Sequence, residues 1–291
     1  MLLRSLLFCL ALLVGYELLV RTIDAWWATG QNNLQNNIVR AQEYMYNAFP
    51  SQNIMVGSSL SARLSREVPD DSLPPHFTNL SFNGQSLYDG LEIVKAQSLL
   101  PKRLYIEANL FMRNEDPKLL NYLFSPIMYP LRRWVHAFRD RNQPIGILAR
   151  LPLAVKGNPR FIHYPSANDN RDERTYQIML TEKVANNSKS IDSLALVRQS
   201  NKLGEYITYF QQKEVEVIFF VMPVDCTLEK TKSARQIVEA VRQLAGQYHC
   251  LLIEAPPCGQ YVTADGNHLQ PASVFRFLRY FRHELARRNA L

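Results

Sequence analysis

The sequence contains little of what marks several specialised protein classes. It has 4 Cys among 291 residues, too few for a small domain held together by disulfides. Its 11 Gly and 16 Pro exclude a collagen-like or low-complexity chain. A single long apolar run and a mean hydropathy of −0.20 argue against a polytopic membrane protein. Hydrophobic residues make up 47% of the chain, which is enough to form the core of one large domain or of two small ones.

The single apolar run stands at the N-terminus. Residues 5–16 carry no charge, Glu17 interrupts the run, and Arg21 and Asp24 end it. Residues 5–20 would span ~24 Å as a helix, slightly less than a ~30 Å hydrocarbon core. Snorkelling ends can make up the difference, and Trp26 and Trp27 suit the water–lipid interface.

This run is predicted to be an uncleaved signal anchor. No small-x-small cleavage pattern follows it, although a cleaved signal peptide and a buried N-terminal helix are alternatives. Arg4 on its short side favours a cytoplasmic N-terminus and an external remainder. We expect localisation to the inner membrane as a single-pass protein, with the main domain in the periplasm.

Beyond the run, short apolar segments alternate with longer amphipathic ones. Continuous apolar strands separated by helices indicate a parallel sheet that is covered on both faces. Helical spacing predicts a joining helix over 34–45, ended by Pro50, and a last helix over 274–285 with Pro271 in its first turn. The predicted strands are 54–56, 104–106, 215–222 and 251–253.

Residues 112–174 break this alternation. They are rich in Pro, Arg and aromatic residues, and we interpret them as an insertion over or beside the sheet. Within them, residues 131–139 form a basic amphipathic segment with two interpretations. Either a helix packs its apolar residues into the domain, or the segment contacts lipid head groups or an anionic glycan. The residues that would pack are Leu131, Trp134, Val135 and Phe138.

The residues at the carboxyl ends of the predicted strands can support acyl chemistry. Ser59 follows the first strand, and a serine hydroxyl needs a base within hydrogen-bond reach to act as a nucleophile. His268 can be that base, and Asp265, three residues earlier, can fix its tautomer. The backbone N–H of Ser59, that of Gly84 and the side chain of Asn109 are candidate oxyanion donors.

Simpler roles compete with these assignments. Ser59 can cap a helix, with Ser58 as the rival nucleophile, and His268 can be an ordinary surface histidine. Gly84 and Asn109 can be turn residues only. The His and Cys residues show no metal-ligand spacing, so we expect neither a metal nor another cofactor. Glu107 ends a strand and receives no role.

The four blocks together resemble the SGNH, or GDSL-like, hydrolase superfamily. Its Gly-Asp-Ser-Leu block reads Gly57-Ser58-Ser59-Leu60 here, and its Asp-x-x-His block reads 265–268. Ser58 replaces the Asp of the family, and the third block lacks the Gly-x-Asn-Asp form. The resemblance implies a three-layer α/β/α fold with a five-stranded parallel sheet in the flavodoxin-like order 2-1-3-4-5. The predicted parts are an anchor (1–22), a helical linker (23–50) and a hydrolase-like domain (51–291) containing the insertion.

Placed in that fold, the cysteines suggest one pairing. Cys226 and Cys258 each follow a strand, and the two strands are expected to be neighbours, which places both at one end of the sheet. We therefore expect a Cys226–Cys258 disulfide on the active-site side. Cys250 stands at the opposite end of its strand and is expected to be buried and free.

The resemblance also implies an activity. Anchored members of the superfamily with a Gly-Ser-Ser block resemble proteins of alginate and peptidoglycan O-acetylation and of lipoteichoic acid D-alanylation. By resemblance, this chain is an O-acyltransferase or esterase, with acetyl the expected group, acting on a cell-surface polysaccharide. A polytopic membrane-bound O-acyltransferase is a candidate partner. The net charge of +7 suits binding to an anionic polymer or lipid surface. Because the main domain is expected to lie outside the cytoplasm, we do not expect nucleic acid as a partner.

Two further classes stay open. One is a lipase or thioesterase at the membrane surface, which would need a wide apolar cleft. The residues that could line such a cleft are Leu119, Leu120, Phe124 and Ile127. The other is a non-catalytic scaffold of a polysaccharide-modification complex.

Overall fold

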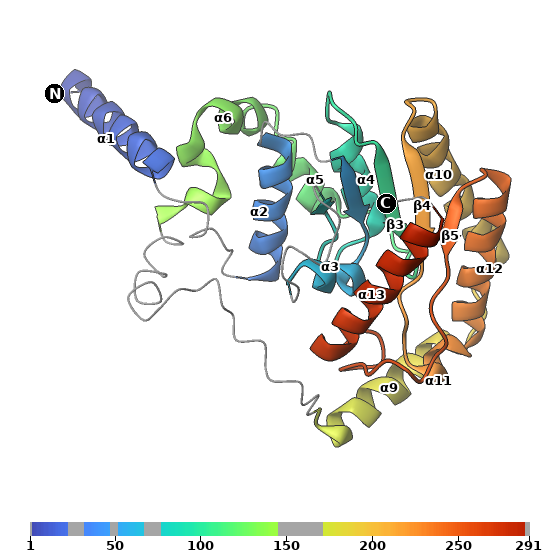
Figure 1. Cartoon of the computed structure of the whole chain (residues 1–291). Coiled ribbons are helices and arrows are strands. Elements are labelled where there is room, and N and C mark those ends of the chain that lie inside the picture. The colour runs from blue at the N-terminus through green and yellow to red at the C-terminus, as the bar shows by residue number, and fades with distance from the viewer. Residues whose placement is uncertain (1, 23–31, 47–51, 67–76, 145–170, 289–291) are drawn as a thin grey trace. The chain divides into compact units, whose positions relative to one another are not determined.

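The computed structural model describes residues 2–22, 32–46, 52–66, 77–144 and 171–288 (Figure 1). The chain divides into two compact units. The first, here the anchor unit, contains Met1–Ala48 and Pro117–Ile162; the second, the sheet unit, contains Phe49–Asp116 and His163–Leu291. The predicted linker and most of the predicted insertion therefore belong to the same unit as the N-terminal helix.

The sheet unit is built on five parallel strands in the order β2-β1-β3-β4-β5. This is the predicted architecture, and it arises because the three central strands are largely buried apolar runs that helices separate. The register aligns Met55 with Tyr105 and Tyr105 with Ile218 across the three central strands. The strands are β1 (Asn53–Val56), β2 (Phe77–Asn79), β3 (Arg103–Glu107), β4 (Glu216–Phe220) and β5 (Leu251–Ile253).

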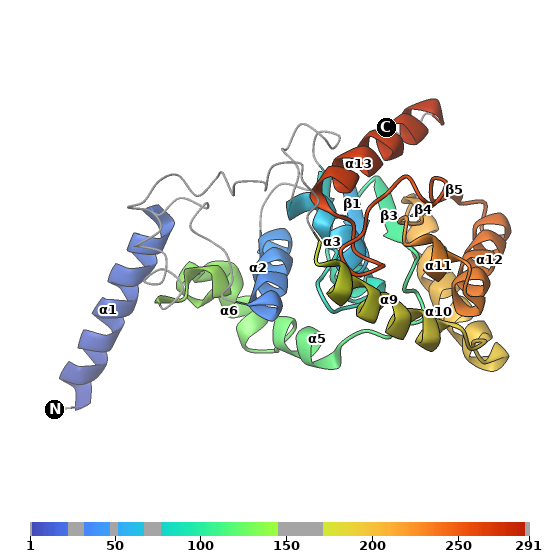
Figure 2. The same ribbon diagram turned by 90° about the horizontal axis from the view of Figure 1, so that it is seen from below.

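Helices cover both faces of this sheet, which gives three layers (Figures 1 and 2). On one face lie α3 (Ser59–Arg66) and α13 (Pro271–Arg287), which begins at Pro271 as predicted. The ring of Phe281 on α13 lies 5.9 Å from that of Tyr105 and 5.2 Å from that of Phe220. Aromatic pairs at this spacing add to the stabilisation from buried area.

The other face carries α4 (Leu87–Lys95), α10 (Ser193–Gln211) and α12 (Lys232–Gln247). Helix α4 approaches β1 so closely that a Cβ at Gly90 would stand 2.9 Å from the Cβ of Val56. Two more helices, α9 (Glu173–Asn187) and the short α11 (Cys226–Glu229), pack on each other. Tyr176, Leu180 and Leu228 form their buried contact.

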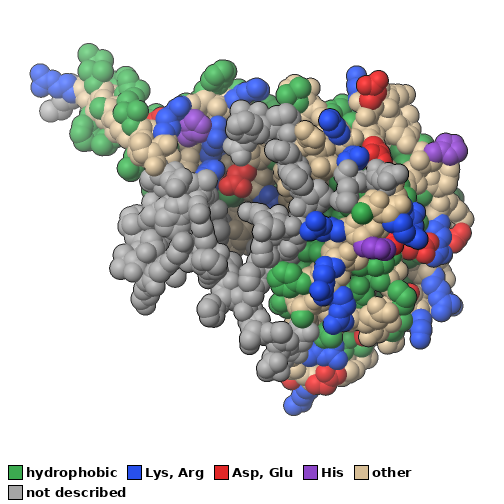
Figure 3. Space-filling view, in the orientation of Figure 1, with side chains coloured by type: hydrophobic (Ala, Val, Ile, Leu, Met, Phe, Trp, Pro, Cys, Tyr) green, Lys and Arg blue, Asp and Glu red, His purple; other side chains and the backbone are tan. Residues whose placement is uncertain are grey.

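The anchor unit contains the apolar N-terminal helix α1 (Leu2–Thr22), which is long and apolar enough to cross a membrane. Figure 3 shows hydrophobic side chains covering most of this helix. The predicted joining helix is present as α2 (Asn33–Tyr46). Trp26, Trp27 and Pro50, for which we predicted interface and helix-ending roles, lie outside the described residues.

Within the described residues, four short helices of the insertion also belong to the anchor unit. They are α5 (Pro117–Leu123), α6 (Met128–Trp134) and the 3-10 turns η3 (His136–Phe138) and η4 (Asp140–Asn142). Gln42 of α2 and Asp140 bind each other twice, with the Gln42 amide donating at 2.5 Å and the Asp140 N–H donating at 2.8 Å. The linker helix and the insertion are thus joined by buried hydrogen bonds.

The basic segment 131–139 differs from the packed helix that was one of its interpretations. Helix α6 ends at Trp134 because Val135 adopts an extended conformation, with φ −109° and ψ 102°. Leu131, Val135 and Phe138 are half-buried, but Trp134 is 75% exposed, so its expected packing is wrong. Leu119, which was proposed to line a lipase cleft, belongs to α5, and its side chain is instead buried.

Candidate active site

The structure brings Ser59, His268 and Asp265 into one hydrogen-bonded chain. Ser59, the first residue of α3, places its Oγ 2.8 Å from His268 Nε2. His268 Nδ1 lies 2.7 Å from Asp265 Oδ2. A carboxylate on one imidazole nitrogen and a hydroxyl on the other is the arrangement by which a histidine activates a serine.

The loop that carries Asp265 and His268 is a compact turn. The second carboxylate oxygen of Asp265 accepts the N–H of His268 at 2.9 Å, and Ala264 N donates to the His268 carbonyl at 2.7 Å. Gly266 stands between them with φ +91°, where a Cβ would meet Leu228 at 2.8 Å. The positive φ favours glycine at this position, and a larger residue would also require the Leu228 side chain to move.

Ser58, the rival nucleophile, is held in a buried network beneath the site. It is 1% exposed, and its hydroxyl donates to Glu107 Oε2 at 2.5 Å while accepting the Leu60 N–H at 3.2 Å. The helix-capping role that competes for Ser59 is thus performed by Ser58. This geometry favours Ser59 as the nucleophile because its hydroxyl is the one that meets His268.

Glu107, for which no role was predicted, organises the loop before Ser59. Its carboxylate is 1% exposed and accepts the Ser58 N–H at 2.8 Å and the Asn109 N–H at 2.9 Å, besides two serine hydroxyls. The only sequence signal was its place at the end of a strand. Its partners come from two loops some fifty residues apart, which spacing alone does not reveal.

Asn109 and Gly84 occupy different environments. The Asn109 amide donates to the Met222 carbonyl at 2.9 Å, and its oxygen accepts the Met222 N–H at 2.7 Å. Asn109 therefore ties the ends of β3 and β4 together, and one of its two amide hydrogens is used in doing so. Gly84 is exposed, with φ +76° and open space around it. Their role as oxyanion donors, like that of the Ser59 N–H, stays a prediction.

Lys183 of α9 is a site residue that the sequence analysis missed. Its Nζ lies 2.7 Å from Asp265 Oδ2 and donates to the Asp265 carbonyl at 2.8 Å. Burial raises the pKa of Asp265, but hydrogen bonds from His268 and Lys183 outweigh burial and hold that pKa far below its usual value. Asp265 is therefore ionised throughout the range in which a histidine titrates. No spacing signal marked Lys183, because 82 residues separate it from Asp265.

Replacing Lys183 by Met is expected to lower the free energy of unfolding by about 1–2 kcal/mol at pH 7, the value of a charge-assisted hydrogen bond. The pKa of the Asp265 carboxyl is lower in the folded chain than in the unfolded chain. The ionised carboxylate therefore stabilises the fold at any pH above its pKa in the unfolded chain. This stabilisation is lost as the pH falls from that value toward the pKa in the folded chain. The wild type loses more of it than Lys183→Met. Because the folded pKa of Asp265 lies far below its usual value, urea unfolding should show the gap between the two chains maintained from pH 7 to about pH 4 and narrowing only in stronger acid. A gap that widens on acidification would contradict the ion pair, and Lys183→Arg should retain most of it.

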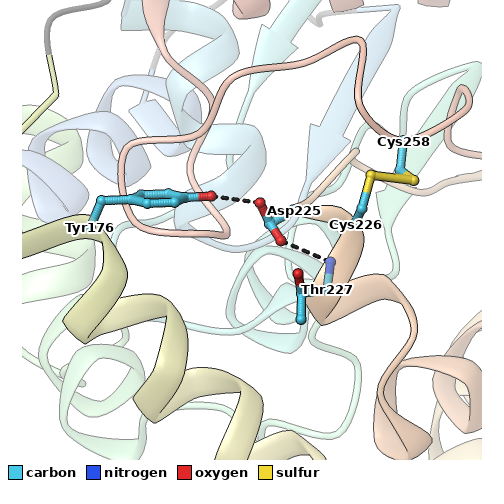
Figure 4. The surroundings of a disulfide bond; sticks show 5 residues. All are labelled: Tyr176, Asp225, Cys226, Thr227 and Cys258. Carbon is cyan, nitrogen blue, oxygen red and sulfur yellow. Dashed lines mark hydrogen bonds between the residues drawn. A yellow bond between two sulfur atoms is a disulfide. The ribbon is translucent and has the colours of Figure 1, made fainter. Parts of the chain in front are cut away.

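The predicted Cys226–Cys258 disulfide is present, with a Cα–Cα distance of 5.2 Å (Figure 4). It joins the first residue of α11 to the loop after β5. Beside it, the Tyr176 hydroxyl of α9 donates to Asp225 Oδ2 at 2.6 Å, and Asp225 Oδ1 accepts the Thr227 N–H at 2.8 Å. Asp225 also donates its N–H to the Gly266 carbonyl at 2.8 Å, which links the disulfide region to the Asp265–His268 loop.

Cys250 is free, as expected, but it is half-buried rather than buried. It follows His249, whose φ is +52°, in the turn that leads into β5, and its sulfur lies near the Gln211 amide and the Tyr248 carbonyl. Burial raises the pKa of the thiol to about 11.

Replacing Cys226 and Cys258 together by Ser is expected to lower the free energy of unfolding by about 3–4 kcal/mol, because the bridge closes a loop of 32 residues. Chemical denaturation of the variant and of the reduced wild type should give similar losses. The matched control is Cys250→Ser, which should leave the denaturation midpoint nearly unchanged. A bridge found at Cys250 by non-reducing peptide mapping would overturn the pairing.

A cavity of about 180 Å³ lies next to the candidate site, within the sheet unit. Leu60, Asn109 and Asn267 line it, and Leu60 and Asn267 are the chain neighbours of Ser59 and His268, whereas the three triad residues are not among its lining residues. Val221, Val238 and Val241 belong to its apolar part, and Arg242 and Glu254 to its polar part. An apolar cavity of ~150 Å³ holds a molecule of benzene, so this one has room for a small acyl group.

Among the described residues, no group of three His, Cys, Asp or Glu side chains could hold a metal ion. Comparisons of the chain with protein-family models, with curated proteins and with solved structures give no match.

Proposed function

We propose that this chain is a membrane-anchored, serine-dependent O-acyltransferase or esterase that works through an acyl-serine intermediate. The observation that carries the proposal is the hydrogen-bonded chain from Ser59 through His268 to Asp265. A hydroxyl 2.8 Å from an imidazole nitrogen is within reach for proton transfer.

In the proposed first step, His268 Nε2 takes the proton of Ser59 as Oγ bonds to the acyl carbonyl carbon. The tetrahedral intermediate then loses its leaving alcohol, which receives that proton from His268. In the second step, water or an acceptor hydroxyl gives a proton to His268 and attacks the acyl carbon of the acyl-serine. The tetrahedral intermediate then expels Ser59 Oγ, which takes that proton back from His268. Asp265, held by Lys183, keeps the imidazole oriented through both steps.

The proposed location is the outer side of the inner membrane. Helix α1 is long and apolar enough to be the anchor, and a disulfide such as Cys226–Cys258 persists in oxidising compartments, the periplasm among them. An anchored enzyme at that surface suits a cell-surface glycan as acceptor or substrate. The acetyl group is the proposed acyl group, and a polytopic membrane-bound O-acyltransferase is the proposed donor partner. The cavity beside the triad is large enough for this group.

Two measurements test the proposal. A serine-directed fluorophosphonate should label the purified full-length chain at Ser59, and absence of label would remove the enzyme class in favour of a scaffold. The O-acetyl content of surface glycan in cells carrying Ser59→Ala then shows whether the enzyme adds or removes acetyl groups. A loss of acetyl indicates a transferase, and an excess indicates an esterase. Labelling with no change in glycan acetyl content would favour the lipase or thioesterase alternative.

A further inference from the structure

The end of helix α1 is hydrogen-bonded to the segment that follows α6, within the anchor unit. The Glu17 carboxylate accepts the Ala137 N–H at 2.7 Å and lies 3.0 Å from His136 Nδ1. Arg21 binds Glu17 at 2.7 Å and donates to the Trp134 carbonyl at 3.2 Å. We name residues 134–142 the docked segment; its far end receives a hydrogen bond from the Tyr16 hydroxyl at the Asn142 carbonyl.

The position of Glu17 along α1 sets the depth of this segment. The helix has 21 residues, which at ~1.5 Å each give ~32 Å, about the thickness of the hydrocarbon core. Glu17 lies five residues before the end of α1 at Thr22, roughly 8 Å back along the axis. A carboxylate at that depth is costly unless it is paired, and the docked segment and Arg21 supply its partners. The docked segment therefore lies against the last two turns of α1, at the C-terminal end of any span that α1 makes.

Helix α6 leads into the docked segment and exposes an apolar face. Ile127, just before the helix, is 76% exposed and Trp134 at its end is 75% exposed, seven residues apart and thus on one side. Pro130 and Arg133 are exposed as well. Figure 3 shows basic side chains and a histidine gathered beside the end of α1. Tryptophan with an adjacent arginine suits the level of lipid head groups.

The buried arginines of this region have a different task. Arg132 is 3% exposed and donates to the Tyr122 carbonyl at 3.0 Å, with its guanidinium 4.4 Å from the centre of the Tyr122 ring. Arg139 is 8% exposed and donates to the Arg132 carbonyl at 2.9 Å. These two hold the fold of the insertion, whereas Arg133 points outward and can meet a lipid phosphate.

We propose that the exposed face of α6, with Trp134 and Ile127, lies in the water–lipid interface of the membrane that α1 crosses. This is a second membrane contact, and its partner is a bilayer with anionic head groups. The hydrogen bonds between α1 and the docked segment make the two contacts continuous. The inference concerns attachment and does not rest on the proposed activity.

Tryptophan fluorescence tests this contact in the full-length chain. The sequence has 3 Trp, so Trp26→Phe with Trp27→Phe leaves Trp134 as the single emitter. The protein is reconstituted in vesicles of phosphatidylcholine and phosphatidylglycerol with bromine on the acyl chains near the head group. We expect brominated lipid to quench emission about twofold or more, and aqueous iodide to quench it weakly. Strong iodide quenching without quenching by brominated lipid would overturn the proposal and leave this face to a glycan or another protein.

A matched probe controls for incidental quenching. With all three native Trp changed to Phe, Leu194→Trp places the emitter on α10, at a site that is 73% exposed. Trp134 should be quenched by brominated lipid clearly more than this probe, and equal quenching would refute a specific contact. Ile127→Trp in the same background should behave like Trp134. Arg133→Glu should reduce the quenching of Trp134 in anionic vesicles and leave it unchanged in vesicles of phosphatidylcholine alone.

Discussion

Replacing Ser59 by Ala is expected to lower kcat/KM for a small acetyl ester such as p-nitrophenyl acetate by roughly 10⁴-fold or more. The acyl-serine cannot form without the Ser59 oxygen, which stands 2.8 Å from His268 Nε2. His268→Ala should lose a similar factor because no base then takes the proton. The double variant should lose little more than either single one, since the members of a triad act as a unit.

The matched control for this series is Ser188→Ala. Ser188 is an exposed serine at the end of α9 whose hydroxyl binds the Val184 carbonyl, so its loss should leave kcat/KM unchanged. Near-normal turnover in Ser59→Ala, together with loss in Ser58→Ala, would transfer the nucleophile to Ser58. If the loss in kcat/KM of the Ser59, His268 double variant equals the product of the two single losses, the two residues do not act in one shared mechanism.

Replacing Glu107 by Leu is expected to lower the free energy of unfolding by about 3–5 kcal/mol. Leucine is similar in size but accepts no hydrogen bond. The donors that Glu107 now satisfies, which include the Ser58 and Asn109 N–H groups, would then be buried without their partner. Glu107→Gln should lose less, because one oxygen remains to accept while the amide nitrogen replaces the other. Urea denaturation at pH 7 measures both losses.

The matched control is Glu216→Gln on the neighbouring strand. Glu216 makes an exposed ion pair with Arg103 at 2.8 Å, and exposed pairs contribute about 0–1 kcal/mol. A Glu107→Leu loss as small as that of Glu216→Gln would mean that the buried network does not hold the loop. If Ser58 and its neighbours position Ser59, Glu107→Gln should also reduce turnover. Measuring turnover therefore separates an effect on loop geometry from an effect on folding alone.

Much of the fold was predictable because its signals are local. Buried parallel strands have continuous apolar runs, as β1 and β4 do, and the helices between them show their own spacing. Asp265 and His268 stand three residues apart, so their contact could be expected from sequence alone. Ser59 was predictable because strand ends of a parallel sheet converge at one edge.

What was missed depends on long-range packing. Lys183 reaches Asp265 from a helix 82 residues earlier, and nothing in the pattern of α9 indicates which of its faces meets the loop. Trp134 was expected to pack, but the helix ends there, the following residue is extended, and the indole is exposed. The tie between Asn109 and Met222 likewise joins two strands 113 residues apart.

The pairing of Glu17 with the docked segment has a consequence for the order of events during synthesis. Ala137 is made 120 residues after Glu17, which at ~5–20 residues per second means a delay of roughly 6–24 s. In the topology proposed above, α1 therefore enters the membrane well before the docked segment has been synthesised. The hydrogen bonds between Glu17 and this segment can form only after residues 134–142 have been translated. An unrelated membrane helix put in place of α1 would still tether the chain, but it would leave the Ala137 N–H without its acceptor. If α1 is the proposed anchor, it is thus a late-assembled part of the architecture and not an interchangeable membrane helix.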